Sequence, residues 1–414
     1  MTSERMYWRL SAIISCFLSL VLIALWITMS DYEFDERQLS SHDEAMSKIK
    51  DTWSSHNEDP GAQSKDTLMT LPTGVFIQSL QFLNSSDVHV SGYIWQRYAC
   101  DPIAGAAAGI AVSSPSKCTN ANIPIPEVGD TGFILPEQVY SGSDISPNEV
   151  YRKLTADKAH LKIAWYFEAT LRQAFEYKWY PFERKTAWLR MWPKEFSKNL
   201  VLIPDYEAYD STSIDDIFGI ETDIVLGPWI IEDTYFDYHF THYDTNFGIE
   251  GYIGKDNFPE LYFNFVVKRK LGSAFIVYLL PLALVATLLF GAMLTVTHND
   301  VISEHMVFNT SGFIVASSGL FFVVMFAHIQ FRKQFPDSGT IYIEYFYIWM
   351  YMIIVTTAAN AYLFSVSSPA LDGVLQRQDN LIPKVIYWPI LIGGFIAITL
   401  WVALITDISP YTHR

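Results

Sequence analysis

Four long apolar stretches without a charged residue occupy the last third of the chain, at residues 273–297, 306–331, 345–366 and 385–406. Each is long enough for a helix that crosses a hydrocarbon core of about 30 Å. Short connections within a helix bundle force consecutive helices to run antiparallel. The sequence therefore predicts a four-helix transmembrane domain at residues 271–408, which excludes an ordinary soluble fold for this part of the chain.

A fifth apolar stretch, residues 10–29, lies near the start of the sequence. Arg5 and Arg9 precede it and a group of acidic residues follows it, which favours a start inside the cell and a crossing to the outside. We interpret residues 1–30 as an uncleaved membrane anchor. A cleaved signal peptide is the alternative, although the stretch is longer than a usual signal core and no Ala-x-Ala site follows it.

The region between the first apolar stretch and the other four is strongly acidic. Residues 31–266 carry 36 Asp and Glu against 18 Lys and Arg, a formal charge of −18, compared with −16 for the whole chain. Such a field attracts cations and repels nucleic acid, but it also keeps an ordinary domain soluble. Residues 31–69 are polar without a sustained apolar period, and we interpret them as an acidic tether.

Short runs in which aromatic or β-branched residues alternate with polar ones fill residues 70–270. We expect strands at residues 74–83, 88–98, 162–175, 186–192, 223–233, 235–243 and 260–268. The absence of helical periods between them favours an all-β, immunoglobulin-like antiparallel sandwich on the extracellular or periplasmic side. Cys100 and Cys118 flank a loop of small residues, and the spacing is compatible with a disulfide or with two free thiols.

Four local patterns occur in an order that is typical of one protein family. They are the stretch GYIWQRY at residues 92–98, WYPFE at residues 179–183, Arg269 twelve residues before Pro281, and Pro336 after the second of the four spans. In this order the chain resembles a bacterial pentameric ligand-gated ion channel subunit of the Cys-loop receptor superfamily, over about residues 70–406. The family lacks the N-terminal anchor and tether, and Glu183 replaces its usual Asp.

The resemblance implies a gating junction in which Glu183 pairs with Arg269, although both could simply be surface charges near lipid headgroups. The residues expected at this junction are Asn84, Asp87, Tyr180, Pro181, Phe182, Glu183, Arg269 and Pro336. It also implies a ligand pocket between subunits whose aromatic rings hold a cationic amine. The candidates are Tyr93, Trp95, Tyr206, Tyr209 and Tyr252, for each of which an ordinary core position is the favoured explanation.

The second span has the polar texture that a pore requires. Steps of three or four residues predict a pore-lining face of Glu304, Ser311, Val315, Ser318, Phe322, Phe326, Ile329 and Lys333. Rings of Phe322 and Phe326 would close the pore by dewetting. A shift of one residue would replace Phe322 by Phe321. The other alternative is that these rings pack between helices and that the Ser and Thr hydroxyls bond back to the preceding turn. Glu304 and the acidic outer domain favour cations, whereas Lys333 opposes them.

The sequence carries no Gly-rich phosphate loop, no Ser/His/Asp arrangement and no metal-type Cys cluster, so we expect no enzyme, no catalytic residue, no cofactor and no metal site. We expect a multi-pass protein of the cell (inner) membrane that acts as a ligand-gated, cation-selective channel. Its expected partners are four further copies of itself, membrane lipid, a small extracellular ligand or protons, and the permeating ions, but no nucleic acid. The alternative is a membrane-anchored sensor or binding protein without ion conduction.

Overall fold

The chain divides into two compact units. The computed structural model describes residues 2–30, 42–57, 69–100, 118, 122–139, 147–156, 159–175, 177–195, 200–212, 216–249, 256–297, 310–335, 339–366 and 379–407. What we call the helical unit comprises residues 1–33, 176–183 and 269–414, and the β unit comprises residues 34–175 and 184–268. The loop 176–183 thus belongs to the helical unit, although the residues on both sides of it belong to the β unit.

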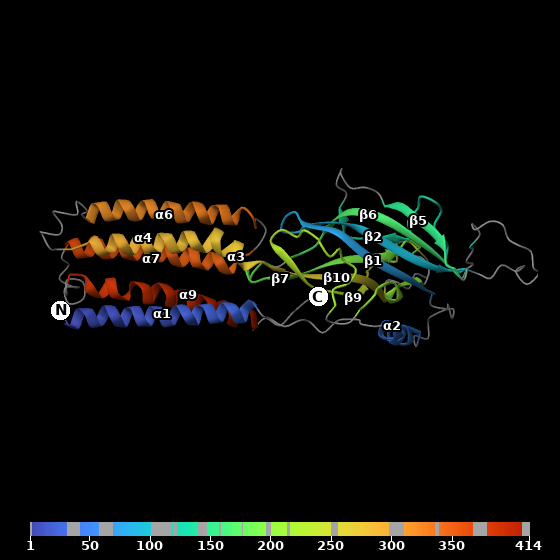
Figure 1. Ribbon diagram of the computed structural model, residues 1–414, viewed down its shortest axis with the longest axis horizontal. Coiled ribbons are helices and arrows are strands. Elements are labelled where there is room, and N and C mark those ends of the chain that lie inside the picture. The colour runs from blue at the N-terminus through green and yellow to red at the C-terminus, as the bar shows by residue number, and fades with distance from the viewer. Residues whose placement is uncertain are drawn as a thin grey trace, which may run out of the picture. The chain divides into compact units, whose positions relative to one another are not determined.

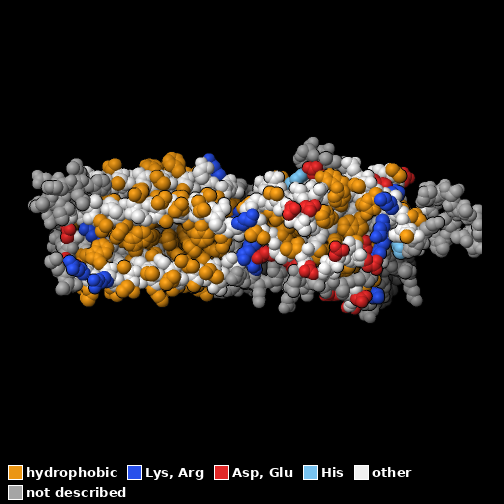
Figure 2. Space-filling view, in the orientation of Figure 1, with side chains coloured by type: hydrophobic (Ala, Val, Ile, Leu, Met, Phe, Trp, Pro, Cys, Tyr) orange, Lys and Arg blue, Asp and Glu red, His pale blue; other side chains and the backbone are white. Residues whose placement is uncertain are grey.

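Five helical segments among the described residues are long and apolar enough to cross a membrane. They are α1 (Thr2–Ser30), the continuous segment Leu271–Thr295, α6 (Thr310–Arg332), α7 (Tyr342–Val366) and α9 (Leu381–Asp407). Figure 1 shows α1 alongside α9, and α6 packs against α7. Hydrophobic side chains cover most of the face of this unit seen in Figure 2. The arrangement is compatible with a multi-pass membrane helix bundle.

A one-turn π-helix interrupts the segment Leu271–Thr295, which consists of α3 (Leu271–Ala274), η3 (Phe275–Leu279) and α4 (Leu280–Thr295). Pro281 has no N–H group, so the carbonyl of Val277 lacks its regular helical donor. The π-helix is rare and occurs mostly as a single turn of this kind inside an α-helix, frequently at functional sites.

Two sheets form the β unit. Among the described residues, the first sheet has six strands in the order β4 (Gln138–Val139), β6 (His160–Arg172), β2 (Asp87–Ala99), β1 (Met69–Phe82) and β8 (Leu200–Pro204), with β5 (Asn148–Leu154) also paired to β6. The second has four, in the order β3 (Phe133–Ile134), β7 (Arg184–Pro193), β10 (Asp256–Arg269) and β9 (Trp229–His242). Strands β1 and β8 are parallel, whereas β1–β2, β2–β6 and β7–β10 are antiparallel.

The two sheets share one hydrophobic core. Every second side chain of a strand points to the same face of its sheet, and the inward ones include Val75 of β1, Trp165 of β6 and Phe263 of β10, all fully buried. Helix α2 (His42–Asn57) adds Ala45 and Ile49 to this core. Part of the stretch that we interpreted as a tether is therefore a helix that packs on the β unit, because two apolar residues four positions apart share one helix face.

The strand predictions agree with the structure for β1, β2, β6, β7 and β10. Residues 223–233 and 235–243 differ, because they contribute to a single strand, β9, that begins only at Trp229. The sequence analysis missed β5 and β8. Strand β5 has no buried residue on either face, and the five residues of β8 are all buried, so neither strand shows an alternation of polar and apolar residues.

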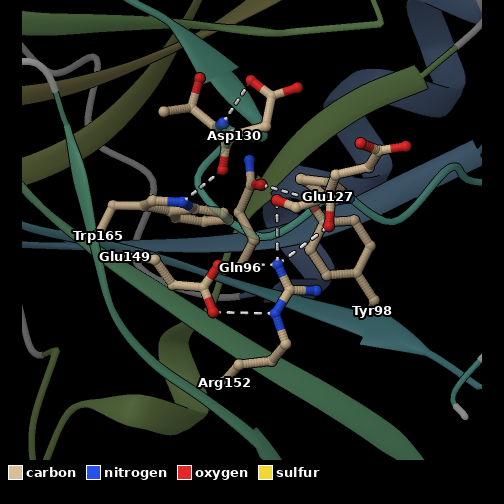
Figure 3. A network of polar contacts seen from close by, with 9 residues as sticks. Gln96, Tyr98, Glu127, Asp130, Glu149, Arg152 and Trp165 are labelled. Carbon is tan, nitrogen blue, oxygen red and sulfur yellow. Dashed lines mark hydrogen bonds and ion pairs between the residues drawn. The ribbon is translucent and has the colours of Figure 1, made fainter. Parts of the chain in front are cut away.

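A polar network fixes the segment 126–132 against β2, β5 and β6 (Figure 3). Arg152 of β5 donates to both carboxylate oxygens of Glu149, at 2.9 and 2.8 Å, and to the backbone carbonyl of Pro126 at 3.0 Å. The indole of Trp165 donates to the carbonyl of Asp130 at 2.8 Å. The hydrogen bonds from Arg152 lower the pKa of Glu149 below its ordinary value of 4.5.

Cys100 and Cys118 form a disulfide, which resolves the choice that the sequence left open. The bond follows β2 directly and closes a loop of 18 residues. In the loop-entropy description, closing a loop of this size stabilises a fold by about 3 kcal/mol.

We expect Glu149→Gln to lower the free energy of unfolding of the β unit by about 2 kcal/mol at neutral pH, because the guanidinium of Arg152 loses its anionic partner. The folded-state pKa of Glu149 is depressed, so its contribution is present above the ordinary value of 4.5 and is lost as the pH falls through the folded-state value. The difference between wild type and variant should therefore shrink in acid. Thermal unfolding across pH measures it.

Glu127→Gln is the matched control for this prediction. Glu127 contributes its backbone carbonyl to Arg152, at 3.3 Å, and its side chain is exposed, so the substitution leaves the hydrogen bond in place. An equal effect of the two substitutions, or a Glu149→Gln effect that does not change with pH, would contradict the role of the ion pair.

Candidate functional site

The loop 177–183 and the end of β10 meet through an ion pair. Strands β7 and β10 are antiparallel, and Lys268 lies opposite Arg184. Arg269 follows Lys268 on β10, and Glu183 directly precedes Arg184, the first residue of β7. The pairing of the strands thus places these two side chains together, and Arg269 Nε donates to Glu183 Oε1 at 2.7 Å.

This ion pair is shielded from solvent. The side chain of Glu183 is 3% exposed and that of Arg269 is 13% exposed. The guanidinium carbon of Arg269 also lies 4.7 Å from the centroid of the Tyr180 ring, a cation–π contact. The pair is therefore not a pair of loose surface charges, and the loss of one partner would leave the other charge poorly solvated.

Aromatic side chains hold the same loop against the helices. The ring of Tyr180 contacts Tyr278 of η3, Phe331 of α6 and Phe335, with centroids 5.0 to 5.7 Å apart. The ring of Phe182 lies 6.0 Å from that of Tyr342, the first residue of α7. Burial raises the pKa of Tyr180, so its hydroxyl stays neutral. A displacement of this loop must therefore move side chains at one end of α6.

Backbone contacts add to this attachment. The N–H of Tyr342 donates to the carbonyl of Lys178 at 2.9 Å. The hydroxyl of Tyr278 donates to Gln334, just beyond α6, at 2.6 Å. The loop is thus joined to three helical segments by direct bonds or ring contacts.

The expected pore face lies on the uncovered side of α6. Ser311, Val315, Ser318, Phe322, Phe326, Ile329 and Lys333 are all exposed, with Val315 at 72%, Phe322 at 53% and Phe326 at 61%. The opposite side is buried, and its residues are Phe313, Ser317, Val324 and Phe331. Glu304 lies outside the described residues.

The neighbouring residue Phe321 has a different environment. It is half-buried, and its ring centroid lies 5.1 Å from that of Tyr351 on α7. The shifted register, in which Phe321 replaces Phe322, would therefore require this ring to leave its contact with α7.

A charged cluster joins the end of α6 to the start of α7. Arg332 donates to Glu344 at 3.1 Å, and His328 Nε2 lies 3.5 Å from the same carboxylate. The other ring nitrogen of His328 lies 3.1 Å from the hydroxyl of Tyr351. The Glu344 side chain is 6% exposed, and its carboxylate balances the positive charge of Arg332 within the helical unit.

The remaining expected junction residues are Asn84, Asp87, Pro181 and Pro336. Asn84 and Asp87 belong to the β unit, in the turn that connects β1 and β2. The Asn84 side-chain oxygen accepts from the N–H groups of Ser86 and Asp87, both at 2.8 Å. Hydrogen bonds from Arg172 and Asn84 lower the pKa of Asp87. Pro181 is buried in the loop and follows a cis peptide bond, and Pro336 lies outside the described residues.

The expected ligand-binding residues fall into two groups, which meet where the rings of Trp95 and Tyr209 lie 5.6 Å apart. Tyr93 is half-buried on β2 and contacts Tyr166 of β6 at 5.4 Å. Trp95, two residues on, is also half-buried, and it donates to Asp205 at 3.0 Å.

Tyr206 and Tyr209 form the second group, because both pack against the core of the β unit. The hydroxyl of Tyr209 donates to the Val75 carbonyl at 2.8 Å and accepts from the Val75 N–H at 2.8 Å. Burial raises the pKa of both tyrosines. Their rings hold the segment after β8 in place, which is the core role that the sequence left open. Tyr252 lies outside the described residues.

The sequence analysis missed an aromatic cluster in the second sheet. The rings of Trp192, Tyr243 and Phe247 lie 5.6 to 6.0 Å from one another. Phe247 is 41% exposed and has a positive φ of 53° in a tight turn. The strand pairing brings Trp192 to residues about fifty positions away, so local periodicity gave no signal for the cluster.

A buried cation lies beneath these rings. The guanidinium of Arg190 lies 5.1 Å from the Trp192 ring and pairs with Glu137 at 3.0 Å and Glu260 at 2.9 Å. Burial raises the pKa of Glu260. Arg190 thus occupies one face of the Trp192 ring within the β unit. Phe247 is the member of the cluster with the most exposed surface.

No known protein-family model and no curated protein matches this chain.

We expect Glu183→Gln to destabilise the protein, because the substitution leaves the guanidinium of Arg269 without its carboxylate. Removal of one partner of a buried ion pair typically costs about 3 to 5 kcal/mol. The double variant Glu183→Gln/Arg269→Gln should recover part of this loss. The measurement is the apparent melting temperature of the purified protein in detergent for the two single variants and the double variant.

Glu232→Gln provides the comparison for a less buried pair. Glu232 contacts Arg184 at 2.7 Å, but both side chains are 24% exposed, so we expect a loss of at most about 1 kcal/mol. If Glu183→Gln were no more destabilising than Glu232→Gln, the pair of Glu183 and Arg269 would behave as ordinary surface charges.

Proposed function

We propose that the chain is a subunit of a homopentameric ligand-gated ion channel in the cell membrane. The observation that carries this proposal is the uncovered face of α6, a helix long and apolar enough to span a membrane. That face presents the side chains of Ser311, Ser318 and Lys333, and the Ser318 hydroxyl donates to the Ile314 carbonyl of the same helix at 2.9 Å. The opposite side of the helix packs against α4 and α7. Polar groups on one face of a spanning helix are expensive in lipid and usual in a water-filled pore.

In the proposed pentamer, five copies of this face surround the pore. Phe322 and Phe326 form two apolar rings, and Ser311 and Ser318 line the stretch on one side of them. A narrow apolar constriction excludes water and ions until it widens. The exposure of both phenylalanines in the single chain supports this assignment, because neither ring is used to pack α6 on its neighbours.

The loop 177–183 transmits the signal in this proposal. It connects β6 to β7 along the chain, and its aromatic residues contact Phe331 of α6 and Tyr342 of α7. The ion pair of Glu183 and Arg269 joins the loop to a residue two positions before the start of α3. We propose that the β unit is a ligand-binding sandwich outside the cell whose motion reaches α6 through this loop.

The ligand in this proposal is a small cationic amine or the proton. Tyr93 and Trp95 on β2 supply one set of aromatic surfaces, and the cluster of Trp192, Tyr243 and Phe247 supplies another. Aromatic faces of this kind attract cations. No bond of the ligand is broken in this proposal, so the protein acts by transport down a gradient and not by catalysis.

Cation selectivity is the more favourable assignment on charge. Of the two adjacent basic residues at the end of α6, Arg332 is balanced by Glu344, so its charge opposes cations less than a free guanidinium would. The acidic β unit would raise the local concentration of cations.

The second candidate is a sensor or binding protein that does not conduct. The observation that favours it is the exposure of three large apolar side chains on α6, Phe322, Phe326 and Ile329. Such side chains also suit contact with lipid or with another helix.

We expect Phe322→Ala to increase current severalfold, because it widens the apolar constriction. The measurement is the current through purified protein in planar bilayers, recorded while the bath pH and the concentration of small amines are varied. Phe321→Ala is the matched control, since it removes the same ring from the face that contacts Tyr351. We expect it to lower stability and to leave the conductance of open channels unchanged.

Three outcomes would contradict parts of the proposal. Silence of folded wild type and both variants would favour the sensor. A conductance change in Phe321→Ala alone would favour the shifted register of α6. A reversal potential in a KCl gradient that follows chloride would exclude cation selectivity.

A further inference from the structure

Helix α1 makes side-chain hydrogen bonds that a simple membrane anchor does not need. Ser11 is 7% exposed, and its hydroxyl donates to the backbone carbonyl of Val385 on α9 at 2.5 Å. Pro389 lies four residues after Val385 within the same helix and has no N–H group. Ser11 therefore satisfies a carbonyl that the helix itself leaves without a donor, where no water is available.

A second contact lies at the other end of α1. The indole of Trp26 donates to the hydroxyl of Tyr342 at 2.8 Å. That hydroxyl lies 2.7 Å from Thr399 Oγ1 on α9, and Thr399 donates its own proton to a backbone carbonyl of α9. The Tyr342 proton is thus directed to Thr399, and one chain of hydrogen bonds connects α1, α7 and α9.

Trp26 also contacts the aromatic residues that hold the loop 177–183. Its ring centroid lies 5.0 Å from Phe275 of η3, 6.2 Å from Phe346 of α7 and 6.2 Å from Phe182 of the loop. Phe182 is 8% exposed and precedes Glu183 directly. Trp26 therefore contacts both the loop and Tyr342, the residue whose N–H binds the loop backbone.

We infer that α1 is a structural part of the helical unit and not only a membrane anchor, and that Trp26 is a positioning residue for the loop 177–183. It sets Phe182, and through the next residue it sets the carboxylate of Glu183 against Arg269. The consequence for gating rests on the proposed channel function, whereas the positioning itself does not. The ring of Trp26 thus adds a contact from α1 to the contacts that Phe182 makes with Phe275 and Tyr342.

The position of Trp26 gives the inference a matched control. Trp8 lies on the same helix near its opposite end, and its ring contacts Phe290 of α4 at 6.4 Å. It touches neither the loop nor Tyr342 among the contacts of the described residues. Trp26→Ala and Trp8→Ala therefore remove the same side chain from the same helix, with and without a contact to the loop.

The first experiment is hydrogen–deuterium exchange of the full-length protein in lipid nanodiscs. We expect exchange of residues 177–183 to be up to about tenfold faster in Trp26→Ala, since lost aromatic contacts of this kind are worth at most about that factor. Trp26→Phe retains a ring and should remain close to wild type. Trp8→Ala should leave this segment unchanged. Equal exchange in Trp26→Ala and Trp8→Ala, with both folded, would overturn the positioning role.

The second experiment measures the open fraction of the current in planar bilayers during stepwise acidification of the bath. A change in Trp26→Ala that is absent in Trp8→Ala supports the link to gating. If the exchange differs and the open fraction does not, the link to gating is overturned and the positioning role stands. If wild type carries no current, the proposed channel function fails, and the exchange experiment still decides whether Trp26 positions the loop.

Discussion

The antiparallel pairing of β7 with β10 is the constraint on which the candidate site depends. Because Lys268 lies opposite Arg184, the next pair of positions brings Arg269 to Glu183 without any further device. A slip of β10 by one residue along this ladder would turn the side chains of β10, Arg269 among them, to the opposite face. The core side chains of the same two strands, Leu189 and Phe263 among them, fix that register. The position of the ion pair is thus a consequence of how the β unit packs.

The sequence predicts the membrane helices well and the sheets less completely. The hydrocarbon core sets a minimum length for an apolar helix, so the five stretches stand out without knowledge of tertiary contacts. The longer strands were also predictable, because one face is buried and one is not. Strands β5 and β8 were missed since one lies at a sheet edge and the other is buried throughout. Helix α2 was missed because Ala45 and Ile49 are its only buried residues among those described.

The candidate site was predictable where one motif carried it. The order of residues 179–183 and Arg269 pointed to their pairing, and a helical period was enough to select the face of α6 that is exposed. The cluster of Trp192, Tyr243 and Phe247 depends on strand pairing over long separations, which a single sequence does not reveal. The roles of Ser11 and Trp26 were equally hidden, because a serine and a tryptophan are ordinary residues of a membrane anchor.

The bond between Ser11 and Val385 also concerns how the protein is made. Helix α1 leaves the ribosome long before α9, so the Val385 carbonyl receives its donor from Ser11 only after both helices are in the membrane. Until then the Ser11 hydroxyl can donate to a carbonyl of its own helix, as Ser19 does to Ser15. Assembly of the helical unit therefore exchanges a local hydrogen bond for one that joins residues 374 positions apart in the sequence.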